Sequence, residues 1–322
     1  MGLAMRWCLR AALILLAAGS PAARGGDPGT RIGVLLAGED EDARQASLAY
    51  FAAGLDAAAS RRPELEVLSR HVDAADEAGA AAAIEEMRVA GVEVLVAFGD
   101  EAARRARPAV RSQAVVFAAV DPASAAELRR GGNACVAAGA SPAQIVADLR
   151  RASPSLKRVG VYVPAGDEAA RANAADLGAE TEVVIAEGTG ATAFERAGAA
   201  LAKLLPGADA VWLPPSVSGE EAAAMARMMQ SRGVPLVGSR AAHLRAGCAI
   251  VVRADPHDLG ALAAVLVRQV LARTDPAKIV VRRTSRRLLE VNLPSAKRLA
   301  WRPSLSLLAW ADTILRSREV PR

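Results

Sequence analysis

The chain has 322 residues, of which 52% are hydrophobic and only 3% aromatic, enough apolar material for the core of one large domain or two domains. Its formal net charge of +5 comes from 40 basic and 35 acidic residues. The arginines are scattered along the sequence rather than massed, which argues against a nucleic-acid-binding protein.

The N-terminal segment has the pattern of a secretory signal peptide. Arg6 and Arg10 precede an apolar run over 11–18, which is shorter than the ~20 residues that a membrane span needs, and small residues follow at 19–23. We therefore predict a signal peptide over 1–22 and a periplasmic mature protein. Cleavage there removes two arginines and no acid, which lowers the net charge from +5 to +3.

Strands and helices alternate from residue 31 onwards. The strands are apolar throughout, as parallel strands buried on both faces are, and the first helical segment carries Leu48, Phe51 and Leu55 at helical spacing. This order predicts an α/β fold with a doubly wound parallel sheet. The expected strands are 31–37, 65–71, 92–98 and 114–120, and the expected helices are 43–60, 74–90 and 101–110.

The same rhythm restarts after the Gly-rich break at 131–133, which predicts a second, similar lobe. Its expected strands are 158–163, 182–186, 210–213 and 235–238, and its expected helices are 145–152, 168–177, 194–205 and 220–232. The sequence then continues with further strands and helices after the second lobe is complete, which simple tandem domains would not have. This last part is expected to contain strands at 248–252, 279–281 and 288–293, and helices at 255–272 and Ser304–Arg316.

The stretch 91–103 contains the most informative junction. An apolar run over 92–98 ends at Gly99 and Asp100, and a helical segment starts at once. Loops after parallel strands gather at one edge of the sheet, where open α/β proteins bind small molecules. That edge is expected to hold Gly38–Asp42, Gly99–Glu101 and Asp121–Ala123.

The order of several stretches resembles the solute-binding proteins of ABC transporters, of the tryptophan or aromatic-amino-acid type, which have the type I periplasmic binding fold. The resemblance covers about residues 31–315, and its most specific part is Leu289–Lys297 followed by a final helix that starts with Pro-Ser-Leu at 303–305. The other stretches that carry it are Arg31–Leu36, Val94–Gly99, Val116–Pro122, Gly131–Asn133, Leu156–Val161 and Val234–Arg240.

The resemblance implies two doubly wound parallel-sheet lobes joined by three short crossings, which would act as a hinge. It assigns 31–133 plus 251–281 to lobe one, and 136–247 plus 284–322 to lobe two. It places the crossings near Asn133–Ala137, Gly247–Val251 and Val281–Ser285.

The family binds its ligand between the lobes, at the carboxyl ends of the strands. On this chain that implies the binding residues Gly38, Glu39, Gly99, Asp100, Glu101 and Asp121 in lobe one, and Pro164, Pro214, Pro215, Ser216, Ser239 and Arg240 in lobe two. Backbone N–H groups at the first helical turn after Gly99 would receive a ligand carboxylate. Asp121 would pair with a ligand ammonium, and Ser239 or Arg240 would close from the other lobe.

Other interpretations of these residues remain open. Asp100 equally suits a helix N-cap, Asp121 before proline suits a turn, and Arg240 suits a solvated surface. The family has Thr where this chain has Asp100, which argues against a ligand carboxylate at this corner and leaves room for a cationic or neutral ligand. A family Tyr is replaced by Val-Val-Arg at 251–253, so one aromatic contact is missing.

The predicted crossings contain two of the three cysteines, Cys135 and Cys248. Hinge strands of this fold run side by side, and an exported protein meets an oxidising compartment. We therefore hypothesise a disulfide between Cys135 and Cys248 that pins the hinge. The alternative is that both are unpaired small residues of the core.

Catalytic motifs are not recognisable in the sequence: it has no nucleophile elbow, phosphate loop with lysine, zinc-binding His pair or Cys with a partnering His. Glu85–Glu86 and Glu220–Glu221 are expected on solvated helix faces, and Phe98 and Trp212 in the core. The three histidines stand far apart, which favours surface or structural roles. They are His71, His243 and His257.

These features predict a non-enzymatic, exported solute-binding protein without a cofactor. It would capture a small organic ligand, such as an amino acid or a related solute, and deliver it as a monomer to an inner-membrane ABC permease. The alternative is a periplasmic sensor subunit that reports ligand occupancy to a membrane kinase or another membrane signalling protein.

Overall fold

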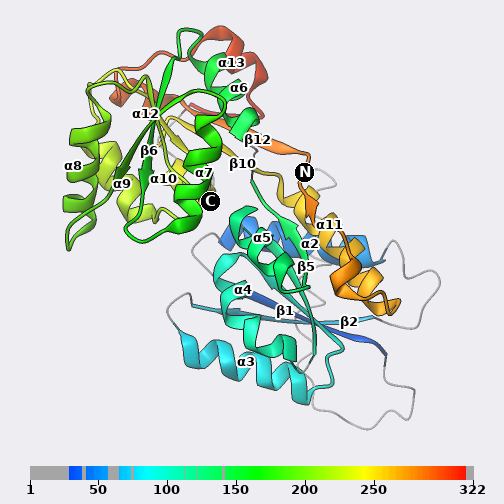
Figure 1. Cartoon of the computed structure of the whole chain (residues 1–322). Helices are drawn as coiled ribbons and strands as arrows, with labels where there is room; N and C mark the ends of the chain where they lie inside the picture. The colour runs from blue at the N-terminus through cyan, green and yellow to red at the C-terminus, as the bar shows by residue number, and fades with distance from the viewer. Residues whose placement is uncertain are drawn as a thin grey trace.

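The computed structural model describes residues 29–37, 41–56, 65–73, 76–111, 113–120, 122–139 and 142–316, so the predicted signal peptide lies outside the described part. Figure 1 shows two lobes, each built from a sheet with helices packed against it. The predicted fold class, α/β with two doubly wound lobes whose sheets are mainly parallel, is confirmed. None of the described helices is long and apolar enough to cross a membrane.

The sheet of lobe one contains six strands of the described chain. They are β1 (Arg31–Ala37), β2 (Glu66–Val72), β3 (Val94–Phe98), β4 (Ala114–Val120), β5 (Ala134–Ala137) and β11 (Arg282–Arg283). Their order across the sheet is β11-β5-β4-β3-β1-β2, and every neighbouring pair is parallel. Each pair of strands that follow one another along the chain therefore needs a crossover, which the helices provide.

Helices cover both faces of this sheet. They are α2 (Glu41–Asp56), α3 (Glu77–Val89), α4 (Asp100–Ala106), η2 (Arg107–Arg111), α5 (Pro122–Arg130), α11 (Pro256–Leu271) and η3 (Pro276–Lys278). Because successive side chains of a strand point to opposite faces, Val34 of β1 enters one core with Phe51 of α2, while Leu35 enters the other core with Met87 of α3. The strand is apolar throughout because both of its faces are buried.

Helices α2 and α11 approach each other unusually closely. A Cβ atom added at Gly260 of α11 would lie 2.4 Å from the carbonyl oxygen of Ser47 and 2.7 Å from the backbone nitrogen of Phe51. On α2, a Cβ atom at Gly54 would lie 2.9 Å from Cβ of Ala264. The two glycines thus let the backbones meet and attach α11, which comes late in the sequence, to the first crossover helix.

The sheet of lobe two contains seven strands of the described chain. They are β6 (Arg158–Val163), β7 (Glu182–Glu187), β8 (Ala210–Trp212), β9 (Leu236–Gly238), β10 (Ile250–Ala254), β12 (Arg287–Asn292) and β13 (Thr313–Leu315). The order is β13-β12-β10-β9-β8-β6-β7, and the only neighbouring pair in it that runs antiparallel is β10 and β12. The carboxyl end of β12 therefore lies at the edge of the sheet where β10 and the strands parallel to it begin.

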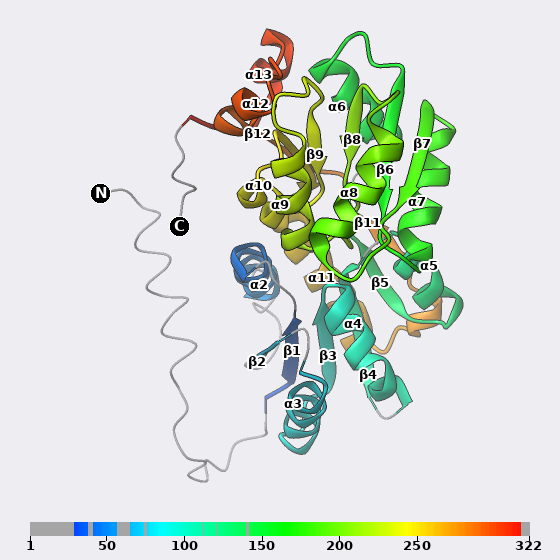
Figure 2. The same cartoon turned by 90° about the vertical axis from the view of Figure 1, so that its left-hand side faces the viewer.

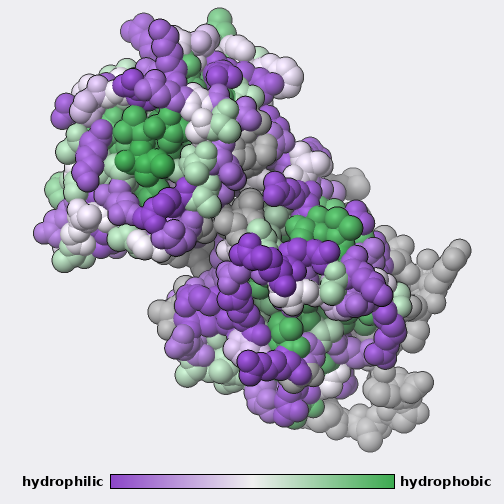
Figure 3. Space-filling view, in the orientation of Figure 1, coloured by the Kyte–Doolittle hydropathy of each residue, from purple (hydrophilic) through white to green (hydrophobic). Residues whose placement is uncertain are grey.

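A single hydrophobic core joins this sheet to the helices of lobe two. The helices are α6 (Pro142–Ala152), α7 (Glu168–Gly178), α8 (Ala193–Leu204), α9 (Gly219–Met228), α10 (Ala241–Ala246), α12 (Leu293–Arg298) and α13 (Leu305–Trp310). Figure 3 shows an apolar patch on this lobe between α7 and α8. The edge strand β7 contributes apolar surface to this lobe, because its Ile185 is 44% exposed.

The chain passes between the sheets three times, and two passages come later than expected. β5 pairs with β4, so 134–137 belong to the sheet of lobe one, although the first crossing was predicted there. β10 pairs with β9, so 250–254 belong to lobe two, although lobe one was predicted to resume at 251. In both places a short apolar strand extends its sheet before the chain leaves it. The third passage falls between Arg283 and Arg287.

The second and third passages are tied together by carboxylates at the start of α11. Oδ2 of Asp258 accepts hydrogen bonds from the backbone N–H groups of Ser285 (2.8 Å) and Arg286 (3.1 Å). Asp255 forms an ion pair with Arg286 at 3.1 Å, and on the lobe-two side Asp148 receives two hydrogen bonds from Arg287, at 2.6 and 2.9 Å. The third passage is thus anchored at both of its ends.

The C-terminal segment corrects the predicted helix Ser304–Arg316. Only Leu305–Trp310 are helical, and β13 follows as a parallel partner of β12. Asp312 makes this possible because its backbone N–H donates to the carbonyl of Leu289 (2.8 Å) and its Oδ2 accepts from the N–H of Leu289 (2.7 Å). The predicted strand at 279–281 is also displaced, to Arg282–Arg283.

Candidate functional site

The candidate site lies where the two lobes face each other. Figures 1 and 2 show α2, α4 and α5 of lobe one opposite α7 to α10 of lobe two, and α5 contacts α7. Each of these helices follows the carboxyl end of a strand along the chain. The loops between those strands and helices therefore carry the groups that a molecule between the lobes would meet.

Gly99 joins the ends of three strands in lobe one. Its N–H donates to the carbonyl of Ala118 in β4 over 2.8 Å, and a Cβ atom there would lie 3.6 Å from the carbonyl oxygen of Ala37 in β1. Its φ of 93° lies in the region that favours glycine. Helix α4 starts at the next residue, Asp100, which is exposed at this edge.

The carboxylate of Glu101 is paired with two arginines of its own helix, α4. Its carboxylate forms an ion pair with Arg104 and accepts a hydrogen bond from Nε of Arg105 at 2.8 Å, and Arg105 also pairs with Glu77 of α3. The carboxylate is therefore compensated inside the α3–α4 pair. What Glu101 offers at the lobe edge is its backbone, not its side chain.

The end of β4 carries backbone strain beside this edge. The register between β4 and β5 shifts between Phe117 and Val120, and Ala119 has φ of 58°, which is rare for a residue with a Cβ atom. Such strain costs about 1–3 kcal/mol and concentrates at functional sites. Ala119 stands two positions before Asp121.

Three predicted site residues, Gly38, Glu39 and Asp121, lie outside the described part of the chain.

In lobe two, the predicted residues follow β6, β8 and β9. Pro164 and Pro215 are half-buried, Pro214 is buried and Ser216 is exposed. Nη1 of the half-buried Arg240 donates to the carbonyl of Pro215 over 3.2 Å. The loops after β8 and β9 are thus joined, and they present two prolines, a hydroxyl and a guanidinium on one edge.

The hydroxyl of Ser239 is already engaged within the protein. It accepts a hydrogen bond from Nε1 of Trp212 over 2.9 Å and donates to the carbonyl of Leu213 over 2.6 Å. Trp212 and Phe98 are almost completely buried, as predicted. Ser239 therefore fixes the loop after β9 relative to β8.

His243 completes this arrangement from α10. Its ring is fully buried, Nδ1 accepts from the backbone N–H of Ser239 at 3.0 Å, and Nε2 lies 2.8 Å from the carbonyl of Val217. Because Nδ1 faces a donor and Nε2 faces an acceptor, these contacts select the neutral tautomer with its proton on Nε2. The predicted structural role for this histidine is confirmed.

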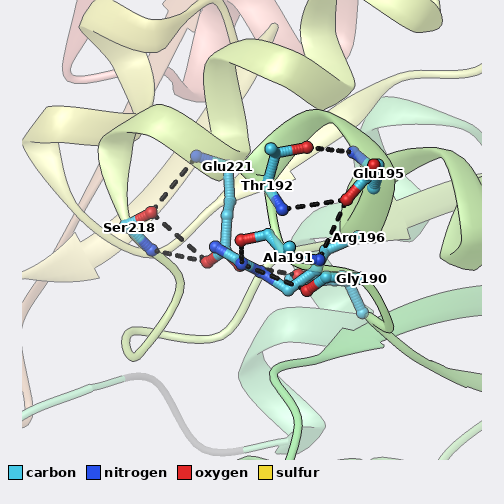
Figure 4. A network of polar contacts seen from close by, with 8 residues as sticks. Gly190, Ala191, Thr192, Glu195, Arg196, Ser218 and Glu221 are labelled. Atoms are coloured by element: carbon cyan, nitrogen blue, oxygen red, sulfur yellow. Dashed lines mark hydrogen bonds and ion pairs between the residues drawn. The ribbon is translucent and has the colours of Figure 1, made fainter.

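A buried carboxylate links the loops before α8 and α9 (Figure 4). Oε1 of Glu221 accepts from Nε of Arg196 at 2.6 Å and from the hydroxyl of Tyr162 at 2.9 Å, while Ser218 contacts Oε2. Arg196 in turn donates to the carbonyl of Ala191 at 3.0 Å. Glu221 is only 6% exposed, so the prediction of a solvated face for Glu220–Glu221 is wrong for Glu221.

These contacts also set the charge state of the network. Burial alone raises the pKa of Glu221, but hydrogen bonds from Arg196, Tyr162 and Ser218 outweigh it and hold that pKa below its ordinary value. Burial raises the pKa of Tyr162, and the neighbouring Glu221 charge raises it further. Glu221 is thus ionised and Tyr162 is a proton donor at neutral pH.

The comparison with protein-family models decides the family. The model described as ABC transporter substrate binding protein matches residues 40–314. The chain belongs to this family. Among curated protein sequences, none matches it.

Several solved structures share the fold of this substrate-binding protein. The ABC domain of Streptococcus pneumoniae in complex with L-Trp has a TM-score of 0.69 at 19% identity, over 89% of this chain and 100% of that one. A conserved domain protein of Vibrio cholerae has a TM-score of 0.70 at 18% identity, over 89% and 99%. The ligand-free, open substrate binding protein CD0873 of Clostridium difficile has 0.69 at 14%, over 89% and 99%. These likenesses establish the type I periplasmic binding fold.

The hypothesised disulfide of the substrate-binding protein does not form. Cys135 and Cys248 are both free and buried, and they belong to separate hydrophobic cores, Cys135 to one core of lobe one and Cys248 to the core of lobe two. The first passage between the lobes begins after β5, so Cys135 lies inside a sheet and not on a hinge strand beside Cys248.

The two structural networks of lobe two left partial signals in the sequence. Ser218 and Glu221, like Thr192 and Glu195, stand three positions apart before an apolar helix, and both pairs form capping boxes. That spacing could have placed Glu221 at a helix start. Its partners Arg196 and Tyr162 lie 25 and 59 residues away along the chain, so their contact depends on the folded sheet.

Among the described residues, no cluster of His, Cys, Asp or Glu could hold a metal ion.

Proposed function

We propose that this substrate-binding protein captures a small organic ligand between its lobes and delivers it to an inner-membrane ABC permease. The observation that carries the proposal is the arrangement of two sheets whose loops after the strands face each other, joined by three short passages. A ligand that contacts both edges would favour the closed arrangement by its differential affinity.

The charges at the two edges support a bipolar ligand, such as an amino acid or a related solute. Asp100 is exposed on lobe one, while Arg240, together with Pro214 and Pro215, lies on lobe two. A ligand with a cationic end toward Asp100, an anionic end toward Arg240 and an apolar body would match these groups. The complex of the Streptococcus pneumoniae domain with L-Trp makes amino acids the first class to screen.

Export to the periplasm forms part of the proposal and rests on the signal-peptide pattern at 1–22. A binding protein that serves an inner-membrane permease has to meet its ligand on that side of the membrane. A permease and an ATPase encoded beside the gene would support delivery, whereas a membrane kinase in their place would contradict it.

A thermal-shift screen with amino acids, small amines and small carboxylates tests binding, because a ligand that binds only the folded state raises Tm. We expect at least one bipolar solute to stabilise the protein, and the Tm shift to fall in Asp100→Asn and Arg240→Gln. Arg245→Gln serves as the control, because it removes an exposed arginine from α10, the helix that starts directly after Arg240. A broad panel without any stabilising solute would overturn the proposal.

A further inference from the structure

A cavity lies on lobe two, away from the candidate site. It has a volume of about 380 Å³, which falls in the range of ~300–1,000 Å³ for small-molecule pockets. The lining residues come from α12 and the segment that follows it. They are Leu293, Ala296, Lys297, Ala300, Trp301, Arg302 and Pro303.

The strand directions separate this cavity from the loops of the candidate site. Because β12 runs antiparallel to β10, with Ile250 opposite Val291, its carboxyl end lies where the parallel strands begin. The candidate site gathers where those parallel strands end. Figure 2 accordingly shows α12 and α13 at the end of lobe two that is remote from lobe one. A molecule in this cavity would not touch the facing edges of the lobes.

The backbone around the cavity is held firmly. The carbonyl of Arg298 accepts from the N–H of Ser231 at 2.9 Å, and that of Leu299 accepts from the N–H of Gly233 at 2.7 Å. The N–H of Trp301 donates to the carbonyl of Ala296 at 2.9 Å. Between them, Ala300 has φ of 57°, a conformation that costs about 1–3 kcal/mol and persists where the surroundings enforce it.

The lining combines an apolar wall with polar groups that lack partners. Lys297 and Arg302 are exposed, and within the described chain their side chains take part in no hydrogen bond or ion pair, whereas the neighbouring Arg298 donates to Oγ of Ser295 at 2.8 Å. Trp301 as a whole is only 9% exposed. Its indole N–H has no hydrogen-bond acceptor among the described residues and is open to solvent, since it is not one of their buried, unpartnered side-chain atoms. The indole N–H of Trp212, in contrast, donates to Ser239.

We propose that this cavity is a second binding site, for a small amphipathic carboxylate. The apolar residues and the Trp301 ring would hold a ring-sized body, while the indole N–H and the two cations would hold the carboxylate. No acidic residue belongs to the lining, so a cationic ligand would find no counter-charge there. The site is independent of ligand capture between the lobes, and it stands even if that proposed function fails.

The tryptophans provide a direct test. The chain has four, so the indole N–H peaks in a ¹H–¹⁵N correlation spectrum are few, and Trp301→Phe and Trp212→Phe assign the two that matter. We expect phenylacetate to shift the Trp301 peak in a saturable manner and phenylacetamide and phenethylamine to shift it less. The Trp212 peak reports in the same spectrum on the edge that faces lobe one.

Charge-removing variants make the test specific. Because two exposed ion pairs with the carboxylate would be lost, Lys297→Gln combined with Arg302→Gln is expected to weaken phenylacetate binding by about two- to thirtyfold. Lys278→Gln, which removes an exposed cation from lobe one, is expected to leave it unchanged. A Trp301 peak that phenylacetate does not move, or that moves equally in the double variant, overturns the proposal.

Discussion

The indole N–H of Trp212 donates to the hydroxyl of Ser239 over 2.9 Å, and that hydroxyl donates onward to the carbonyl of Leu213 over 2.6 Å. The carboxyl ends of β8 and β9 are therefore joined by side chains in addition to their backbone ladder. Since His243 accepts from the backbone N–H of the same serine, one hydroxyl and one imidazole fix the loop that carries Arg240.

Ser239→Ala tests this arrangement. The change leaves a buried indole N–H without an acceptor, and such a loss costs about 1–3 kcal/mol. We expect the free energy of unfolding in urea to fall by that amount. Ser216→Ala, the same change at an exposed position in the neighbouring loop after β8, should stay within about 0.5 kcal/mol of the original protein. Equal losses in both variants would show that the Ser239 hydroxyl does not carry the stabilisation.

Glu221→Gln tests the buried network of Figure 4. The carboxylate holds Arg196 and the hydroxyl of Tyr162, and hydrogen bonds to charged groups contribute about 1.5–3 kcal/mol. We expect the variant to lose about that much stability at pH 7. Glu220→Gln, which changes the exposed neighbouring residue, provides the matched control, and a similar loss there would argue against a special role for Glu221.

The same network predicts a pH dependence. The pKa of Glu221 in the folded protein lies below its ordinary value, so its stabilisation is complete above the unfolded-state pKa of about 4.3 and is lost as the pH falls through the folded-state value. We therefore expect the stability difference between the original protein and Glu221→Gln to stay constant from about pH 5 to 8 and to shrink below about pH 4. Unfolding curves at several pH values measure it; a difference that persists unchanged at the lowest pH would contradict the ionised state.

The regular parts of the fold were predictable from the sequence because local pattern and tertiary structure agree there. Val34 and Leu35 belong to an apolar run, and both faces of β1 are indeed buried. The end of the chain was not predictable in this way. Leu305, Leu308 and Ile314 follow a helical period, but the pairing of Asp312 with Leu289 pulls the segment into the sheet.

The candidate site shows the same limit. The order of the strands placed Gly99 and Arg240 at the carboxyl ends of strands in the two lobes, since that follows from a parallel sheet. Charge compensation could not be inferred, because the Glu101 carboxylate is bound by arginines of its own helix and Glu221 is buried by residues distant in the sequence. An acidic residue in the sequence does not by itself reveal whether its carboxylate faces a ligand or a partner within the protein.

Asp258→Ala tests the anchoring of the third passage between the lobes. Oδ2 of Asp258 is the acceptor for the amides of Ser285 and Arg286, so its loss exposes both amides to water. We expect their hydrogen-exchange protection to fall, while the amides of β12 keep theirs. Asp176→Ala, at an exposed position on α7, should leave both segments unchanged. Protection at 285–286 that survives Asp258→Ala would mean that other contacts hold this passage.

The thiols offer a test of the corrected cysteine assignment. Burial raises the pKa of Cys135 to about 11, an effect that Arg129 reduces only in part, and burial also raises the pKa of Cys248. Since the thiolate is the reactive form, we expect neither thiol to react with Ellman's reagent in the folded Cys8→Ser protein at pH 8. Both should react in denaturant without any reductant. If no thiol appears in the denatured protein, the two cysteines form a disulfide after all.

Replacement of helical glycines should separate close packing from helix propensity. Alanine is favoured over glycine inside helices by about 0.5–1 kcal/mol, so Gly178→Ala, where nothing lies within 4 Å of the new Cβ atom, should be neutral or slightly stabilising. Gly260→Ala should instead cost about 1–3 kcal/mol, because its Cβ atom would meet the backbone of Ser47 and Phe51 on α2. Thermal unfolding of both variants measures the difference.

Since backbone atoms cannot rotate away as a side chain can, the clash at Gly260 can be relieved only if α11 moves away from α2. A Gly260→Ala protein as stable as Gly178→Ala would show that the two helices have room to separate, and that α11 is attached to lobe one by its apolar face alone.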